Sequence, residues 1–598
     1  MHVYDLLSRT RTSEYLTDSN TYFRFIPTWT RRLQIYTDSG KPTAELDRLG
    51  HADFRVGPTW TLTSELDHRL EHADFRIRPT RAPTSELDRL EHADFRTHFL
   101  MYGKGMQTWE YSPVYAIRSY AYLLIHALPL KLYQSVFSAN KVILFYILRC
   151  LFALICAGCE VYFYKGICKH FGGNTGRIYL TVSLLSGGMF FASSAYLPST
   201  FCMYFTCISM GGWYLRQYEV AIFGTAISAI LGWPFAGILG VPIAIDIVLR
   251  KKKVKFFTAG CIVALALFLV PTVLVDSNYY GKLVITPLNI VLYNVFTDHG
   301  PDLYGVEPFS FYFVNGFLNF NVIFILAIFC LPIIVNLPVW LVTLPMYLWI
   351  VVFFTRPHKE ERFLYPIYPL FSLFGAVAVD HIQKLASYVL PQQSSRHYTE
   401  KTSWIAMGIC TLFSLMSVSR ILAVYHAYHA PLDIYVELNR AAADPKVHTL
   451  STDKSVNLCV GKEWYRYPSS FFLPGDKIPR SLPKPYSSGP DATKIIPTEM
   501  NDMNKEEKSR YINVTKCHYL IDLDVPEETK YEPRYSLNTE DWKVLHSVKF
   551  LHASRSHRVF RAFYIPFISH HFCTFVDYNL LKTTRTKKVS RSRLNSSR

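Results

Sequence analysis

From about residue 98 onward, long apolar runs alternate with short polar loops along the chain. A helix needs about 20 predominantly apolar residues to cross a bilayer, and most of the runs approach that length. We expect about ten membrane segments, at residues 141–163, 178–196, 199–215, 220–232, 234–249, 255–275, 320–336, 338–354, 363–382 and 403–421. Several are interrupted by Gly or Pro, as at Gly232-Trp233-Pro234, and such helices persist in a membrane only when neighbouring helices cover them. The pattern predicts a polytopic α-helical membrane protein.

The first 97 residues follow another pattern, which is polar, basic and repetitive. Glu45–Arg55 returns as Glu65–Arg76 and again as Glu86–Arg96, a spacing of roughly 20 residues that lies near the lower limit for stacked repeats. Each copy offers only a few Leu and Phe, so we expect short helices at best and disorder between them, or the product of a faulty gene model. The repeated His and Asp have no fixed scaffold to orient them around a metal ion.

Charge patterning orients the apolar segments. The net charge of +17 comes from Lys and Arg at helix ends and in the two termini, which suits membrane orientation rather than nucleic-acid binding. The most basic loop, Arg250–Lys255, is expected in the cytosol together with 165–177 and 384–401. The opposite side then receives four segments: 98–140, 276–319, 358–362 and everything after about residue 420.

One of these segments is unusually ionic. Arg356-Pro357-His358-Lys359-Glu360-Glu361-Arg362-Phe363 lies between two apolar runs, 337–354 and 364–379. It can be an interfacial loop whose Lys and Arg side chains extend to the headgroups. The mixture of carboxylates, a His and cations also suits a site that handles a negative group and a proton.

The tail, 422–598, is long enough for a small α+β domain. It contains Cys459, Cys517 and Cys573, two of which can form a disulfide if the tail faces an oxidising lumen. Asn513-Val514-Thr515 is a glycosylation sequon, usable on that side only. Gly461-Lys462-Glu463-Trp464 is either an ordinary strand and turn or a carbohydrate contact. Cys156 and Cys159 have no second ligand pair, so membrane packing is preferred over zinc.

Three stretches together, Tyr102–Tyr120, His358–Phe363 and Gly461–Trp464, resemble the dolichyl-phosphate-mannose-dependent α-1,2-mannosyltransferases of N-glycan assembly, within the C-type glycosyltransferases. The similarity runs from about Thr97 to about Phe563. It implies a multi-pass protein of the endoplasmic reticulum whose active site faces the lumen. It also implies dolichyl phosphate mannose as donor, a lipid-linked oligosaccharide as acceptor and inversion at the transferred sugar. No cofactor is implied with certainty, and a divalent metal requirement is left open.

The resemblance also implies which side chains meet the substrates. Lys359, Arg362, Arg118 and His358 are candidate partners of the departing phosphate, and Glu110, Glu360 and Glu361 are candidate acceptor contacts. The complete predicted set is Trp109, Glu110, Tyr111, Arg118, His358, Lys359, Glu360, Glu361, Arg362, Lys462, Glu463 and Trp464.

The chain departs from the family pattern upstream of Thr97. The resemblance implies a first membrane helix and an acidic motif there, which supplies the general base, whereas here the repeat array runs straight into Thr97. Asp94 belongs to the repeat, so we leave the catalytic base unassigned and expect little or no transfer by this chain.

Three other functions compete with this one. They are a mannosyltransferase of lipid-anchor assembly, a transporter, and a membrane scaffold whose repeats recruit partners. A transporter predicts ionisable residues at mid-membrane depth, where Asp246 and Glu160 are the main candidates. The organisation we expect is a repetitive segment at 1–97, a multi-spanning core at 98–421 and a lumenal domain with a basic tail at 422–598.

Overall fold

The computed structural model describes residues 92–585 except 104, 106–107, 138–139, 297–302, 304, 335–336, 391–396, 445–446, 448–455, 463–465, 467, 475–489, 498, 504, 506–511 and 529–532. The chain divides into two compact units, Met1–Arg78 and Pro79–Arg598, and all described residues belong to the second. The predicted repetitive segment therefore lies outside the described residues as far as residue 91. The helix α2 (His92–Tyr102) already includes the end of the last repeat.

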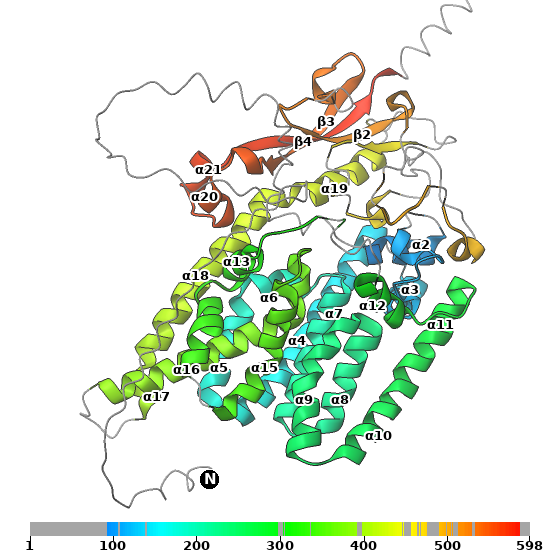
Figure 1. Cartoon of the computed structure of the whole chain (residues 1–598). Helices are drawn as coiled ribbons and strands as arrows, with labels where there is room; N and C mark the ends of the chain where they lie inside the picture. The colour runs from blue at the N-terminus through cyan, green and yellow to red at the C-terminus, as the bar shows by residue number, and fades with distance from the viewer. Residues whose placement is uncertain are drawn as a thin grey trace, which may run out of the picture. The chain divides into compact units, whose positions relative to one another are not determined.

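Each of the expected membrane segments is helical, which confirms the polytopic helical architecture (Figure 1). The helices of the first half are α3 (Tyr120–Val136), α4 (Lys141–Phe171), α5 (Gly173–Leu185), α6 (Gly187–Ala192), α7 (Pro198–Tyr214), α8 (Tyr218–Ile227), η2 (Ser228–Gly232), η3 (Pro234–Gly240), α9 (Val241–Ile245), η4 (Asp246–Arg250), α10 (Val254–Ala264), η5 (Leu265–Leu269), α11 (Val270–Tyr280) and α12 (Thr286–Phe296). The short 3-10 helix η1 (Trp109–Tyr111) precedes them.

The second half continues in the same manner. Its helices are α13 (Phe311–Ile325), η7 (Leu326–Cys330), α14 (Leu331–Ile334), α15 (Leu337–Phe354), η8 (Glu361–Ile367), α16 (Tyr368–Val389), α17 (Tyr398–Lys401), α18 (Ser403–Tyr428) and α19 (Ala430–Ala443). Within the described residues, five helical stretches are long and apolar enough to cross a membrane: Lys141–Phe171, Val254–Tyr280, Phe311–Cys330, Glu361–Val389 and Ser403–Tyr428.

Two helices, α7 and α16, are buried among the others. Nearly every residue of α7 is buried, and α7 contacts α4, α8 and η8. In the helical stretch Glu361–Val389, which contains α16, 94% of an apolar segment of 18 residues is buried. The corresponding share in α18 is 17%. A Cβ atom at Gly166 of α4 would lie 3.0 Å from the Gly211 carbonyl oxygen of α7, so glycine is what lets these two helices approach so closely.

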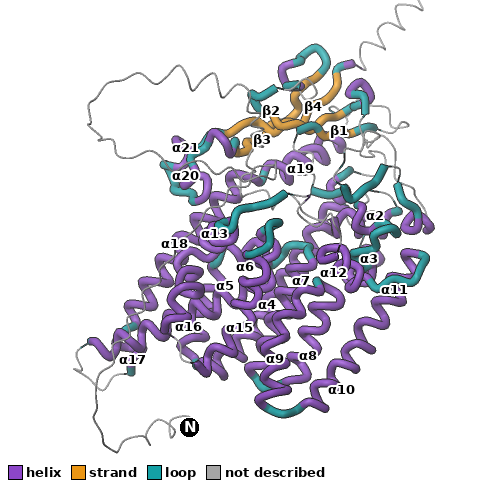
Figure 2. The backbone as a smooth tube through the Cα atoms, viewed as in Figure 1, coloured by secondary structure: helices purple, strands orange, loops and turns teal. Residues whose placement is uncertain are grey.

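The tail forms the predicted small α+β domain (Figure 2). Its sheet has the order β1-β2-β4-β3, built from β1 (Leu458–Val460), β2 (Tyr519–Asp524), β3 (Trp542–Leu551) and β4 (Phe575–Thr583). Only β1 and β2 are parallel. The helix α19 contacts β3 and β4, so the membrane helix α18 leads directly to the sheet. Short helices connect the strands: η10 (Ser470–Phe472), η11 (Pro490–Lys494), η13 (Val514–Lys516), η14 (Tyr535–Leu537), η15 (Ala553–Arg555), α20 (Arg558–Ala562) and α21 (Ser569–Phe572).

Two of the three basic loops lie together, as their predicted common side requires. Asn174, at the start of α5 within the predicted basic stretch 165–177, donates through Nδ2 to Asp380 Oδ1 at 2.6 Å. The Tyr398 hydroxyl donates to the same oxygen at 2.9 Å, and Lys384 Nζ pairs with Asp380 Oδ2 at 2.7 Å.

Candidate functional site

The segments expected on the opposite side also meet. The Trp109 ring contacts Tyr115 and Tyr293, with centroid separations of 5.3 and 5.5 Å. The hydroxyls of Tyr115 and Tyr293 donate to the two carboxylate oxygens of Asp502, at 2.8 and 3.0 Å. Asp502 belongs to the tail, so one carboxylate connects three segments that are far apart in the sequence. This contact brings together three of the four segments that were predicted on that side.

The ionic cluster joins the same assembly through the loop before α13. His358 contacts the Gly305 carbonyl oxygen through Nδ1 at 2.8 Å, and the Glu307 backbone N–H donates to the Pro357 carbonyl at 2.9 Å. Lys359 Nζ donates to the Glu307 carbonyl at 2.9 Å. Both His358 and Lys359 are buried, so Lys359 acts here as a clamp on a neighbouring loop.

Glu360 is the centre of the cluster. Its Oε1 lies 3.1 Å from His358 Nε2, and its Oε2 lies 2.5 Å from Arg362 Nε. Its backbone N–H donates to the Tyr312 hydroxyl at 3.2 Å. Because Glu360 is only 6% exposed, its charge is compensated mainly by protein groups rather than by water.

Arg118 connects the ionic cluster with the aromatic loop. Its Nη2 lies 2.8 Å from Glu110 Oε1. Burial alone would lower the pKa of Arg118, but the negative charge of Glu110, with further contributions from Tyr111 and Glu360, raises it above its usual value. Arg118 therefore remains cationic and interacts electrostatically with a carboxylate of each segment, Glu110 and Glu360.

The backbone around Arg118 is fixed by a carboxylate that the sequence analysis did not single out. Asp276, at the end of α11, accepts hydrogen bonds through Oδ1 from the backbone N–H groups of Tyr120 and Ala121, at 2.7 and 3.1 Å. The Ser119 hydroxyl donates to the same oxygen at 3.0 Å, and the Thr286 hydroxyl donates to Oδ2 at 2.6 Å. An acid at a helix N-terminus satisfies its orphan N–H groups, so Asp276 fixes the start of α3. The one feature of the sequence that marked Asp276 was its position directly after an apolar run.

Arg118 lines a small pocket with a volume of about 20 Å³, which is room for about one water molecule. The lining residues are Tyr111, Ile117, Arg118, Ser119, Tyr122, Pro198, Ile230, Leu231, Gly232, Pro234, Thr286, Pro287 and Ile290. Arg118 is the only charged member of this lining. The pocket thus has mixed apolar and polar walls and one charged side chain, and it is formed where η1, α3, α7, η2 and α12 meet. Of the predicted site residues, Tyr111 and Arg118 line it.

The helix α2 packs beside this cavity through polar contacts. Asp94 Oδ2 pairs with Arg149 Nη2 of α4 at 2.8 Å, and the Thr97 hydroxyl lies 2.9 Å from the Tyr196 hydroxyl. Arg96 Nε donates to the Tyr120 hydroxyl at 3.1 Å. Asp94 is fully buried, and desolvation raises its pKa well above the usual range. These contacts give Asp94 a visible role as an anchor of α2 on α4.

Other predicted residues have internal partners as well. Glu361 Oε1 accepts from Asn319 Nδ2 at 2.6 Å and from the Tyr368 hydroxyl at 3.3 Å, and the Arg420 guanidinium supports its charge. Lys462 pairs with Asp522 Oδ2 at 3.3 Å and donates to the Pro533 carbonyl at 2.9 Å, which holds the end of β1 on β2. Glu463 and Trp464 lie outside the described residues.

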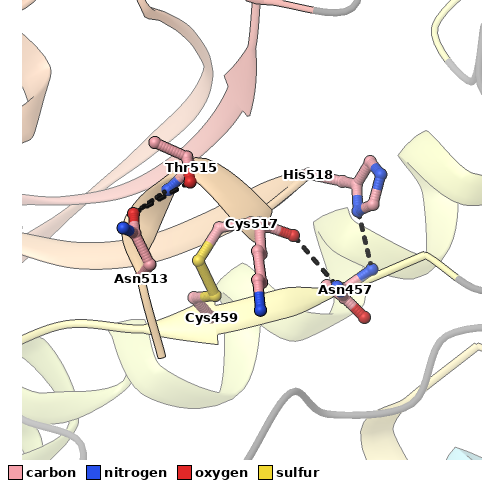
Figure 3. The surroundings of a disulfide bond; sticks show 7 residues. Asn457, Cys459, Asn513, Thr515, Cys517 and His518 are labelled. Atoms are coloured by element: carbon pink, nitrogen blue, oxygen red, sulfur yellow. Dashed lines mark hydrogen bonds between the residues drawn. A yellow bond between two sulfur atoms is a disulfide. The ribbon is translucent and has the colours of Figure 1, made fainter. Parts of the chain in front are cut away.

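The cysteine pairing left open by the sequence is Cys459 with Cys517, across β1 and the start of β2 (Figure 3). Cys573 is a free thiol. Asn513 is exposed, and its Oδ1 accepts from the Thr515 N–H at 3.0 Å and the Thr515 hydroxyl at 2.9 Å. Over the described ranges, His, Cys, Asp and Glu form no group of three or more that could hold a metal ion.

Comparison with known proteins places the chain. Residues 95–474 match the model of the Alg9-like mannosyltransferase family. The mouse protein alpha-1,2-mannosyltransferase ALG9 is 53% identical, over 82% of this chain and 84% of the relative. The Saccharomyces cerevisiae protein of that name is 30% identical, over 78% and 86%. A crystal structure of ArnT from Cupriavidus metallidurans bound to undecaprenyl phosphate is similar at a TM-score of 0.43 and 13% identity, over 66% of this chain and 82% of that one. This chain is a multi-pass membrane glycosyltransferase and belongs to the Alg9-like mannosyltransferase family.

Proposed function

We propose that the chain is an α-1,2-mannosyltransferase that moves mannose from dolichyl phosphate mannose to a dolichyl-diphosphate-linked oligosaccharide. The mouse and yeast relatives carry the name of that activity, at 53% and 30% identity over most of both chains. Neither a mannosyltransferase of lipid-anchor assembly nor a scaffold is favoured by these relatives.

The observation that carries the proposal is the place of Arg118. It is a cation at the edge of a cavity whose other lining residues are apolar or uncharged. A polyprenyl phosphate has the matching form, because its phosphate is anionic and its chain is hydrocarbon. Charge-assisted hydrogen bonds from a guanidinium to phosphate are strong and directional. We therefore propose that the donor phosphate binds at Arg118. The pocket, which has room for about one water molecule in this structure, would have to open along Ile230, Leu231 and Pro234 to admit the first isoprene units.

The ionic cluster supplies the remaining chemistry. The acceptor 2-hydroxyl oxygen bonds to the anomeric carbon while the bond from that carbon to the phosphate oxygen breaks, and dolichyl phosphate leaves with the electron pair. Arg118 stabilises the negative charge that develops on the departing phosphate, together with His358 and Arg362, which both contact Glu360. The hydroxyl proton must pass to a carboxylate. Glu110 and Glu360 are the carboxylates whose charges act on Arg118, so they are the proposed acceptor contacts.

We place the site in the lumen of the endoplasmic reticulum. The disulfide Cys459–Cys517 supports this, because disulfides persist in oxidising compartments. The exposed sequon at Asn513 is compatible with the same side. The loop Arg250–Lys255 would then face the cytosol, as basic loops do.

We expect a low rate of mannose transfer because of the stretch upstream of Thr97. The resemblance implies a catalytic carboxylate there, and in this chain the position is occupied by the repeat. Asp94 is buried and paired with Arg149, which argues for anchoring rather than proton transfer. We therefore propose that the chain binds its donor but transfers little or no mannose.

A reconstituted transfer assay tests both statements. The chain is compared with a chimera in which residues 1–96 are replaced by the corresponding stretch of the mouse relative, using labelled dolichyl phosphate mannose and lipid-linked oligosaccharide. We expect the chimera to add mannose that α-1,2-mannosidase removes, and the unmodified chain to add almost none. A chimera without transfer would overturn the proposed activity. Equal rates would overturn the expected defect and leave the activity standing.

A further inference from the structure

The connection between β3 and β4 carries a group of exposed apolar side chains. Two short helices, α20 and α21, lie within it. The exposed fractions of these side chains are 55% for Val559, 41% for Ile565, 87% for Phe567, 43% for Ile568 and 49% for Phe572. We call residues 558–572 the apolar connection. Single exposed apolar residues are common, but five within one short connection form a patch that favours an apolar environment.

The apolar connection is fixed against the membrane helix α18, as Figure 1 shows for α20. The Tyr564 N–H donates to the Ser419 carbonyl at 3.0 Å, and the Ser419 hydroxyl donates back to the Tyr564 carbonyl at 2.9 Å. The rings of Tyr564 and His426 stack at 4.5 Å. This reciprocal pairing sets the height of the connection along α18.

We infer that this position lies at the edge of the bilayer. A helix rises about 1.5 Å per residue and the hydrocarbon core is about 30 Å thick, so a span that starts at Ser403 leaves the core near residue 423. Ser419 lies just inside this limit. Its neighbour Arg420 supports the charge of Glu361, and Glu361 belongs to the ionic cluster at a helix end. The outward side chains of α18, such as Leu415 at 66% exposed, face lipid at the same level.

The backbone of the connection suits a place with little water. The Ile565 N–H donates to the Ser569 hydroxyl at 2.8 Å, and the Ile568 and Ser569 N–H groups donate to the Ile565 carbonyl at 3.2 and 3.0 Å. Irregular backbone is not found in contact with the hydrocarbon core, but pairing of its polar groups lowers the cost of a place at the headgroups, where water still reaches the remaining groups. Phe567 has φ +64°, a left-handed conformation that is unfavourable for a bulky residue. Exposing a large aromatic in a strained conformation destabilises a soluble loop, whereas burial in lipid offsets the cost.

Polar and cationic side chains around the patch complete the amphipathic character. Arg558, His570 and His571 are exposed beside the apolar side chains. Aromatic and cationic residues of this kind concentrate where lipid tails meet headgroups. We propose that the apolar connection inserts into the headgroup and upper acyl region of the leaflet that borders the ionic cluster, and so anchors the C-terminal sheet to the membrane.

Photolabelling of the full chain from within the bilayer tests this. The protein is reconstituted in phosphatidylcholine vesicles that contain a phosphatidylcholine with a diazirine in its acyl chain, then irradiated and digested with trypsin. We expect lipid adducts on the peptide 562–582 and on the α18 peptide 402–420, which serves as the internal standard. The matched control is the peptide with Leu537, an apolar side chain in the same sheet domain that is 61% exposed, and it should carry none. Adducts on 402–420 without any on 562–582 would overturn the proposal, as would crosslinks from 562–582 to protein only.

A substitution separates insertion from folding. Asn adopts a positive φ more readily than Phe, so Phe567→Asn should fold at least as well while it removes the largest inserted side chain. We expect the adduct yield on 562–582 to fall at least three-fold, with the yield on 402–420 and the melting temperature unchanged. Phe567→Leu should retain most of the labelling. Equal labelling of the Asn and Leu variants would show that Phe567 does not enter the lipid.

Discussion

Replacing Arg118 with Gln removes the one charge that lines the cavity. Two unit charges about 4 Å apart interact by about 4 kcal/mol at the effective dielectric constant of about 20 that suits partly buried sites. Loss of a donor that stabilises a developing negative charge typically costs about 2.7–4 kcal/mol, or about 100- to 1000-fold in rate. The Coulomb energy and the cost of losing such a donor are of the same size, so we expect Arg118→Gln to lower kcat/KM for the donor by about 100-fold or more.

Arg118 also has a structural partner, and the design must separate the two roles. Without the arginine, Glu110 keeps a buried charge that has lost its 2.8 Å ion pair. Such a charge destabilises its surroundings by itself. The double variant Arg118→Gln/Glu110→Gln removes that effect. If the loss comes from the donor phosphate, the double variant should be as slow as Arg118→Gln, and if it comes from the isolated carboxylate, most of the rate should return.

The assay measures initial rates of the chimera that carries the mouse N-terminal stretch, over a range of donor concentrations at fixed acceptor. Arg440→Gln is the control, because this arginine lies on α19 with its side chain 72% exposed. A loss below ten-fold in Arg118→Gln, or a change confined to the KM for the acceptor, would contradict the assignment of Arg118 to the donor phosphate.

Three other substitutions test the surroundings of the site. Asp276→Ala leaves the Tyr120 and Ala121 N–H groups without their acceptor, and a buried unsatisfied donor costs about 1–3 kcal/mol. We expect a clearly lower melting temperature and a raised KM for the donor, and a smaller effect for Asp276→Asn. Equal melting temperatures of the two variants would contradict the role of Asp276 at the start of α3. Cys459→Ser removes a disulfide whose cysteines are 58 residues apart in the sequence. The free energy of unfolding of the sheet should fall by up to about 4 kcal/mol, and the sheet should become protease-sensitive. Cys573→Ser should change little, and unchanged protease resistance in Cys459→Ser would contradict a structural disulfide. Asn513→Gln and Thr515→Ala, expressed in a cell that glycosylates, should both abolish a glycosidase-sensitive mobility shift, and absence of such a shift in the parent chain would argue against a lumenal tail.

The helical architecture was predictable because its signals are local. Runs of apolar residues indicate the segments between 141 and 421 without any tertiary information, and basic loops such as Arg250–Lys255 orient them. The convergence of the aromatic and ionic loops followed from counting sides of the membrane. The contacts of Tyr115 and Tyr293 with Asp502 join three of the segments in that count, and the side of the membrane stays a prediction.

The partners inside the site were not predictable, because they are pairs across long sequence distances. Asp276 and Ser119 are 157 residues apart, and no local pattern marks either as the partner of the other. The consecutive residues Glu360 and Glu361 show the same limit. Glu360 faces His358 and Arg362, whereas Glu361 points to Asn319, and only the turn into η8 decides which side each one takes.

The pairing within the site has a consequence for the proposed chemistry. In this structure both arginines are already paired with carboxylates, Arg118 with Glu110 and Arg362 with Glu360. A carboxylate beside a guanidinium is a weak base, because the positive charge favours its ionised form. A donor phosphate at Arg118 would share that charge and weaken its hold on Glu110, so the carboxylate would become more basic only when the donor is present. We propose that donor binding and the strength of Glu110 as a hydrogen-bond acceptor for the incoming hydroxyl are coupled through one guanidinium, which Lys, with its single point charge, would reproduce only in part.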